Sequence, residues 1–338
     1  MAPHGAEASP LVLEPTPLPE AKPDNKHYLA LLTVPLLWGT FAPALKLLLN
    51  SKAPPPPLAI NLVSHGVATL ALMLLLKKTR TQWSKSDING SLELGFYLFC
   101  GQMTQLLGLN GTKATTNAIF VQSAVIIVPA IELVPEIRRT NFTLKVVRNL
   151  IPSFIALFGI VLVTTTADDD GDGDTFEGVA YSLVAAFFYA LHTIRVSAID
   201  TDPDKQALGQ VAVNFAFDVL ALPFAASSRE WLFYRFTGKF KKLHNFLLAS
   251  GWNGIMVSAF TTWAMSYAQS VVDANTAALA YAMEPVFAAV LAWMFLGDTL
   301  TGAQTCGAIL VVCANIFSQM TLSELLFKVA RCLQPQSS

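Results

Sequence analysis

The stretch Ala277-Ala-Leu-Ala-Tyr-Ala-Met-Glu-Pro-Val-Phe-Ala-Ala-Val-Leu-Ala-Trp-Met-Phe-Leu-Gly-Asp298 decides the fold class. As a helix it is long enough to cross about 30 Å of hydrocarbon. It carries one carboxylate near its middle, Glu284, which is followed directly by Pro285. Because Pro285 has no N–H to donate to the carbonyl of Tyr281 and crowds it, we expect the helix to bend there. A carboxyl group at this depth is costly unless it faces other helices or water. Glu284 is therefore either a functional group or a packing residue that stays hydrogen-bonded.

The composition of the whole chain is that of a polytopic membrane protein. Of its 338 residues, 53% are hydrophobic and 13% are charged, whereas ordinary globular domains carry about 25% charged residues. The net charge of −1 and the absence of a basic stripe predict no nucleic-acid partner.

No motif in the chain predicts a cofactor, a metal site or a catalytic residue. The four cysteines have no metal-ligand spacing, and there is no phosphate-binding GxxxxGK[ST] loop or nucleophile–histidine–acid arrangement. The acidic turn Asp168–Asp174 partly fits a calcium-binding loop. Position 12 of that loop would be Val179, where a bidentate Glu is required, so we interpret the turn as a solvated connection.

Apolar segments recur along the chain and predict an all-α protein with ten transmembrane helices. A Pro-rich tail is expected at 1–27, and the acidic loop 167–176 divides a first half (28–166) from a second half (177–320), with a C-terminal tail at 321–338. The expected spans are 28–49, 58–76, 92–109, 115–134, 150–166, 177–198, 206–226, 245–270, 274–296 and 302–320. Most Lys and Arg residues then fall on the side of the two termini, which predicts that both termini face the cytosol. Nothing in the tail distinguishes the plasma membrane, an endomembrane or a plastid envelope.

The two halves repeat each other. Aligning Leu58-Ala-Ile-Asn-Leu-Val-Ser-His65 with Val211-Ala-Val-Asn-Phe-Ala-Phe-Asp218 places Asn61 on Asn214 and His65 on Asp218. Because each half has an odd number of spans, the second half enters the membrane upside down relative to the first. Inverted repeats with broken helices and polar groups at their interface are typical of secondary transporters.

The sequence resembles the EamA repeats of the drug/metabolite transporter superfamily over residues 30–320. The resemblance rests on Trp38-Gly-Thr-Phe followed by Lys46, and on Glu284-Pro-Val-Phe closing with Leu296-Gly-Asp before a Gly-containing last helix. It implies two inverted five-helix halves, a central cavity and alternating access for a small organic solute. The chain departs from the family pattern at Asp298, where Glu is common, and at Val125, which occupies the position matching Pro285.

Polar residues within the apolar spans are the candidate solute-binding groups, because such side chains face the interior of a helix bundle. Helix–helix hydrogen bonding is the alternative role for each of them. Arg195 lies near a helix end and is expected to reach out to the membrane surface. The candidates are Trp38, Asn61, His65, Gln122, His192, Asn214, Asp218, Tyr281 and Glu284.

The favoured function is secondary transport of a small organic solute, with protons as the coupling partner through Glu284 and Asp218. A membrane scaffold or receptor without transport activity is the alternative. Within transporters, a nucleotide-sugar or organophosphate exchanger is a further alternative. Anionic solutes call for several Lys or Arg residues in the pathway, and only Lys46, Lys113 and Arg195 are candidates.

Overall fold

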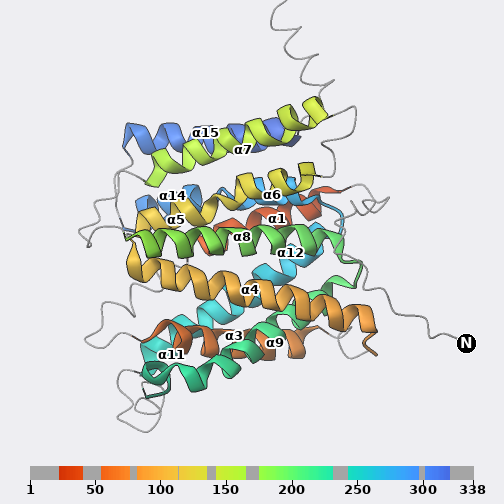
Figure 1. Cartoon of the computed structure of the whole chain (residues 1–338), viewed down its shortest axis with the longest axis vertical. Coiled ribbons are helices and arrows are strands. Elements are labelled where there is room, and N and C mark those ends of the chain that lie inside the picture. The colour runs from red at the N-terminus through yellow and green to blue at the C-terminus, as the bar shows by residue number, and fades with distance from the viewer. Residues whose placement is uncertain are drawn as a thin grey trace, which may run out of the picture.

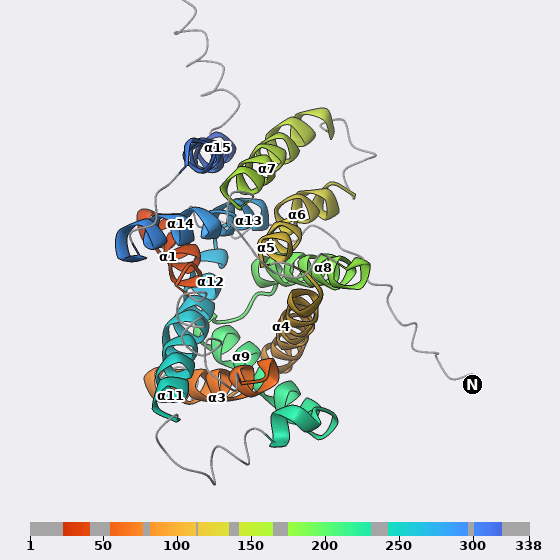
Figure 2. The ribbon, with the colours of Figure 1, turned by 90° about the vertical axis from the view of Figure 1, so that its left-hand side faces the viewer.

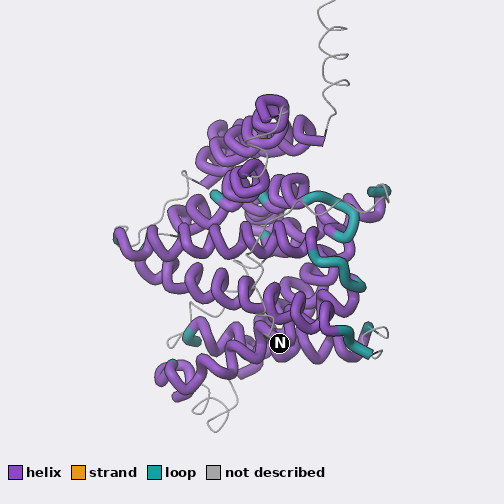
Figure 3. Tube along the Cα trace, turned by 45° about the vertical axis from the view of Figure 1, so that its right-hand side comes forward, coloured by secondary structure: helices purple, strands orange, loops and turns teal. Residues whose placement is uncertain are grey.

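A computed structural model of the chain describes residues 23–40, 55–76, 82–112, 114–134, 142–164, 175–230, 243–296 and 301–319. All regular structure in these residues is helical, as Figure 3 shows. The all-α prediction is confirmed for the described residues. Lys46, Lys113, the acidic turn 168–174, Gly297 and Asp298 lie outside them.

Each range expected to cross the membrane contains helix. The first half comprises α1 (Asn25–Trp38), α3 (Pro57–Leu75), α4 (Lys85–Gly111), α5 (Ala114–Gln122), α6 (Ala124–Leu133) and α7 (Phe142–Thr164). The second comprises α8 (Phe176–Ala198), α9 (Pro203–Ala221), η3 (Leu222–Phe224), α11 (Leu243–Trp252), η5 (Asn253–Phe260), α12 (Thr261–Gln269), α13 (Ala274–Tyr281), α14 (Glu284–Leu296) and α15 (Gly302–Gln319).

Within the described residues, four helical stretches are long and apolar enough to cross a bilayer: Leu58–Leu75, Phe176–Ala198, Pro203–Phe224 and Ala274–Leu291. Shorter apolar helices cover Asn117–Leu133, Leu150–Thr164 and Gly302–Phe317. Many large apolar side chains on these helices point outward, among them Leu75, Phe154, Phe158 and Trp293. Such an outer surface suits contact with lipid rather than with water.

Short polar side chains set where several helices begin. Asp24 Oδ1 accepts the N–H groups of Lys26 and His27 at 3.0 and 3.2 Å, so α1 starts at Asn25, earlier than the expected boundary at 28. At the start of α4, Ser84 and Asp87 cap each other's backbone N–H at 2.9 and 3.0 Å. These contacts satisfy amide groups that have no partner within the helix.

The helix that carries Glu284 is broken, as expected from Pro285. α13 ends at Tyr281 and α14 begins at Glu284, with a turn at Ala282 and Met283 between them. The matching span of the first half is also broken, between α5 and α6 at Ser123, although it has no proline there. The Ser123 hydroxyl donates to the carbonyl of Phe120 at 2.5 Å. In the alignment that places Val125 on Pro285, Ser123 corresponds to Met283.

The helices stack in successive layers along the long axis of the molecule, as Figures 1 and 2 show. α7 packs along α15 at one end of this axis. α3 packs on α9 toward the other end, and between these layers α4 packs along α8 and α1 along α12.

Small residues allow close approach between helices at two crossings. A Cβ placed on Gly159 of α7 would lie 2.7 Å from the carbonyl oxygen of Gly307 in α15, and the reverse distance is 2.5 Å. A Cβ on Gly254, in the π-helical segment η5, would lie 2.6 Å from the carbonyl oxygen of Ser64 in α3. Close backbone contact at small residues is the usual packing mode of helices in lipid.

Candidate functional site

The centre of the α3–α9 interface holds a buried pair of titratable groups. His65 Nδ1 and Asp218 Oδ2 lie 2.6 Å apart and share a hydrogen bond. The His65 side chain is 5% exposed and that of Asp218 1%, so water does not weaken the contact. The two residues that the internal repeat places at equivalent positions therefore touch each other.

Amide groups surround this pair. Asn214 precedes Asp218 by one turn of α9, and its Nδ2 donates to Oε1 of Gln102 in α4 at 2.9 Å. Within the described residues, Asn61 Nδ2, Asn214 Oδ1 and Asp218 Oδ1 are buried without a hydrogen-bond partner in the protein. Buried polar atoms of this kind normally bind water or a ligand. The α3–α9 interface is therefore suited to bind a polar ligand.

The polar contacts continue along α4 toward α8. Gln105 lies one turn after Gln102, and its Oε1 accepts a hydrogen bond from the Tyr189 hydroxyl at 2.7 Å. Sequence reasoning did not single out Gln102, Gln105 or Tyr189. The available signal was the pair of glutamines three positions apart in the mostly apolar second part of α4, which places both amides on one face.

Glu284 lies where the two broken helices meet. Gln122, the last residue of α5, donates through Nε2 to Glu284 Oε2 at 3.0 Å. Both side chains are half-buried. Glu284 and Gln122 were both predicted as site residues, and the structure brings them into direct contact.

Trp38 and Tyr281 form an aromatic contact beside this break. Their ring centroids lie 5.2 Å apart at an interplanar angle of 51°. The Tyr281 hydroxyl donates to Gln269 Oε1 at 2.8 Å, and Gln269 Nε2 in turn donates to the carbonyl of Thr193 and the hydroxyl of Ser197, both at 2.8 Å. Hydrogen bonds through Gln269 thus connect the Tyr281 side chain to α12 and α8.

His192 belongs to a different buried network. Its Nε2 lies 2.6 Å from Oε1 of Gln210, whose Nε2 donates to the Ser266 hydroxyl at 3.0 Å. All three side chains are almost fully buried. This network joins α8, α9 and α12 within the second half. For His192 the structure therefore shows hydrogen bonding between helices, which is the alternative to solute binding named for each candidate residue.

Arg195, expected to reach toward the membrane surface, binds a carboxylate of the other half. Its Nε and Nη2 donate to Oε1 and Oε2 of Glu93 at 2.6 and 3.0 Å. A bidentate pair of this geometry is specific and charge-assisted. Because Glu93 neutralises it, Arg195 is a poor anchor for an anionic solute.

Comparisons with known proteins agree with this architecture. Residues 176–319 match the model of the EamA-like transporter family. The second half of the chain therefore matches an EamA domain. It is also 24% identical over 290 residues to an uncharacterized transporter of Archaeoglobus fulgidus, covering 85% of this chain and 84% of that protein. A crystal structure of a protein, at 15% identity, superposes with a TM-score of 0.65 over 89% of this chain and 98% of its own. The last comparison supports the fold alone. The match to the EamA family and the apolar helices support an integral membrane protein.

The polar contacts described above join the residues that match the EamA model to the half of the chain that precedes them. His65, Gln102, Gln105 and Gln122 lie before residue 176, and each contacts a residue within 176–319. The candidate site is therefore a series of polar contacts across the interface between the two halves of the chain.

Proposed function

We propose that this protein is a secondary transporter that moves a small polar organic solute across a membrane by alternating access between two inverted halves. The observation that carries the proposal is the series of polar side chains at the interface of the halves, from Glu284 through Gln105 and Gln102 to Asp218 and His65. Polar groups at membrane depth are costly, and where they gather they usually mark a solute or ion pathway.

The packing supports an inverted duplication with ten membrane crossings. The helix that opens each half packs on the third span of the other half, as α1 does on α12 and α8 on α4. The second spans pack on each other through α3 and α9, and the last spans through α7 and α15. The fourth span is broken in both halves. Such pairing is expected when a two-fold axis in the membrane plane relates the halves.

The side chains at this interface favour a neutral or cationic solute that can form several hydrogen bonds. The hydrogen-bonding groups are amides, a hydroxyl, an imidazole and two carboxyl groups. Arg195 is paired with Glu93, and Lys205 with Asp87. An organophosphate would instead need cations left free to bind phosphate, and the two described cations at this interface, Arg195 and Lys205, are both paired.

Proton coupling through Glu284 and Asp218 is part of the proposal. A carboxyl group that loads and releases a proton at this interface would change the charge between the halves. The Gln122 side chain can hydrogen-bond to Glu284 in both protonation states. Its amide can donate to a carboxylate or, after rotation, accept from a protonated carboxyl group.

A binding screen tests the proposal. The purified protein is heated with a panel of metabolites, since a bound solute raises the midpoint of unfolding by mass action. We expect neutral or cationic polar compounds to stabilise the wild type and to lose this effect in Gln102→Leu. Glu177→Gln, at an exposed position of α8, should retain it. Stabilisation by phosphorylated compounds alone would favour the exchanger, and no stabilisation by any solute would favour the scaffold or receptor.

A further inference from the structure

Termini of several helices from both halves lie together on one side of the molecule, which is called this end below and is distinct from the two ends of the long axis. α4 begins at Lys85 beside the start of α9 at Pro203, and α8 ends at Ala198 just before it. α1 begins here as well, because His27 stacks on Tyr267 near the end of α12, with ring centroids 4.7 Å apart and planes inclined by 11°. The polar contacts of this region differ from those of the candidate site because Lys and Arg take part in them.

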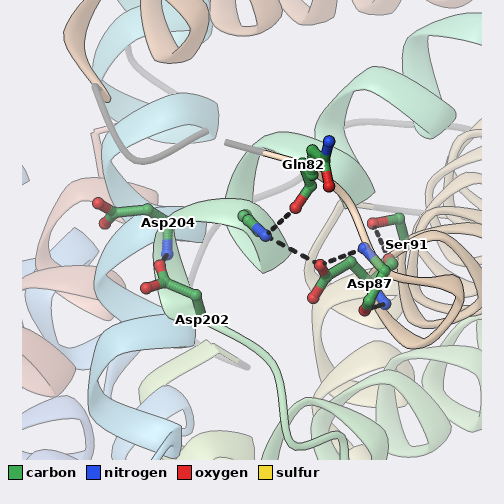
Figure 4. Close-up of polar contacts among 7 residues, drawn as sticks. Gln82, Asp87, Ser91, Asp202 and Asp204 are labelled. Carbon is green, nitrogen blue, oxygen red and sulfur yellow. Dashed lines mark hydrogen bonds and ion pairs between the residues drawn. The ribbon is translucent and has the colours of Figure 1, made fainter. Parts of the chain in front are cut away.

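Figure 4 shows the first charged contact, between α4 and α9. Lys205 Nζ lies 3.0 Å from Asp87 Oδ2 and donates to the carbonyl of Gln82 at 2.8 Å. The two charged side chains are only 14% and 9% exposed. Asp87 is held in place by Ser84, whose N–H donates to the same carboxylate oxygen at 2.9 Å. The acceptor site for Lys205 is therefore preorganised by the helix cap.

The second charged contact joins α4 to α8. Arg195 binds both oxygens of Glu93, and the Tyr97 hydroxyl donates to Glu93 Oε1 at 3.3 Å. The side chains of Arg195 and Glu93 are 32% and 29% exposed. Water therefore reaches this pair more readily than it reaches Lys205 and Asp87.

An aromatic contact extends the same set of helices. The rings of Trp263 and Tyr267 stack with centroids 5.5 Å apart, and the indole N–H of Trp263 donates to Asp204 Oδ1 at 3.0 Å. Asp204 is the neighbour of Lys205 in the chain. The contacts thus link α1, α12, α9, α4 and α8 in sequence across one end of the molecule.

We propose that these contacts form a lock that closes the pathway between the halves at this end, and that both ion pairs must break before a solute can pass there. The lock consists of Glu93–Arg195, Asp87–Lys205 and the stack of His27, Tyr267 and Trp263. The inference rests on the proposed transport function. Each ion pair joins one half to the other, so a movement that separates α4 from α8 and α9 at this end must break both. Ion pairs suit a reversible closure because water solvates both charges when they separate.

Thiol accessibility tests the lock without any solute. Cys100, Cys306, Cys313 and Cys332 are replaced by Ser, and Gln102→Cys provides a single reporter at the interface of the halves. A membrane-impermeant maleimide is applied to vesicles from the side where α4 and α9 begin. We expect slow modification in the parent protein and several-fold faster modification when Arg195→Gln or Lys205→Gln is added.

Matched variants separate loss of the lock from general loosening. The charge-reversed pair Glu93→Arg with Arg195→Glu should return the modification rate toward that of the parent, because it restores opposite charges at the same positions. Lys85→Gln removes a charge from an exposed site next to the lock and should leave the rate unchanged. Rates that are equal in the parent, Arg195→Gln and Lys205→Gln would overturn the proposal. The proposal would also be overturned if Arg195→Gln and the charge-reversed pair were modified equally fast.

This experiment also distinguishes the lock from the proposed function. A protein that binds no solute in the metabolite screen but shows the accessibility changes would have the lock without being the transporter proposed. A protein that transports a solute while its reporter reacts at the same rate in every variant would be a transporter closed by other contacts.

Discussion

His65 and Asp218 hold equivalent positions in the two halves, and they contact each other through Nδ1 and Oδ2 at 2.6 Å. Equivalent residues of a two-fold repeat can touch only where they lie close to the axis. The pair therefore marks the axis that we propose for the inverted duplication. A movement of one half against the other at this place would change the distance between His65 and Asp218, which are both buried.

Breaking this pair should lower stability through the loss of a shared hydrogen bond. We expect Asp218→Asn and His65→Ala each to destabilise the protein, with the double variant less affected than the sum of the two. The coupling free energy should be about 1 kcal/mol or more, the upper range for polar contacts between membrane helices. Reversible unfolding in mixed detergent measures it. Strictly additive effects would mean that the two side chains do not interact in the folded protein.

The α7–α15 crossing gives a prediction with a built-in control. Gly307→Ala places a methyl group 2.5 Å from a backbone oxygen and should cost about 1–3 kcal/mol of stability through overpacking. Gly302→Ala lies in the same helix, where a Cβ meets nothing within 4 Å. It should be neutral or slightly stabilising, because Ala favours helix over Gly by about 1 kcal/mol. Equal effects of the two changes on the unfolding midpoint would contradict the close approach of α7 and α15.

The contact between α3 and η5 provides a second matched pair of glycines. Gly254→Ala brings a methyl group to 2.6 Å from the carbonyl oxygen of Ser64 and should displace α3, which also carries His65. Gly251→Ala meets nothing within 4 Å. We expect the first change to lower both stability and the solute-induced shift, and the second to leave both near the wild-type values. A shift that survives Gly254→Ala unchanged would show that solute binding does not depend on the position of α3.

Glu284→Gln tests proton coupling. The amide cannot take up or release a proton, so uptake should no longer follow a pH gradient while solute binding persists. Uptake into proteoliposomes with and without an imposed gradient measures this, and Glu177→Gln serves as the carboxyl control. If the variant concentrates solute with the wild-type pH profile, Glu284 has a structural role and another group couples transport.

The sequence predicts the helical segments well because the bilayer imposes a length and a hydropathy that local composition reveals. It also predicts the break before Pro285, since proline cannot donate the required hydrogen bond. The break at Ser123 has no such local cause, and the π-helical segment Asn253–Phe260 depends on tertiary packing that a single sequence does not display.

The candidate site was predicted only in part for a similar reason. Asn61, His65, Asn214 and Asp218 stood out because the repeat duplicates them. Gln102 and Gln105 have no obvious duplicate, and their importance comes from the partners that α8 and α9 bring to them. His192 was predicted as a polar residue within an apolar span, but its partner Gln210 lies within the same half of the chain. Which of these residues bind a solute stays a prediction.

Solute counterflow in proteoliposomes tests the central claim most directly. Vesicles loaded with a compound that stabilises the purified protein are diluted into a trace of the same labelled compound. Our account predicts that wild-type protein and Lys85→Gln accumulate label transiently, whereas Asp218→Asn and Gln102→Leu do so much more slowly. Label entry no faster than in protein-free vesicles, or equal entry in all four proteins, would contradict transport through the interface of the two halves.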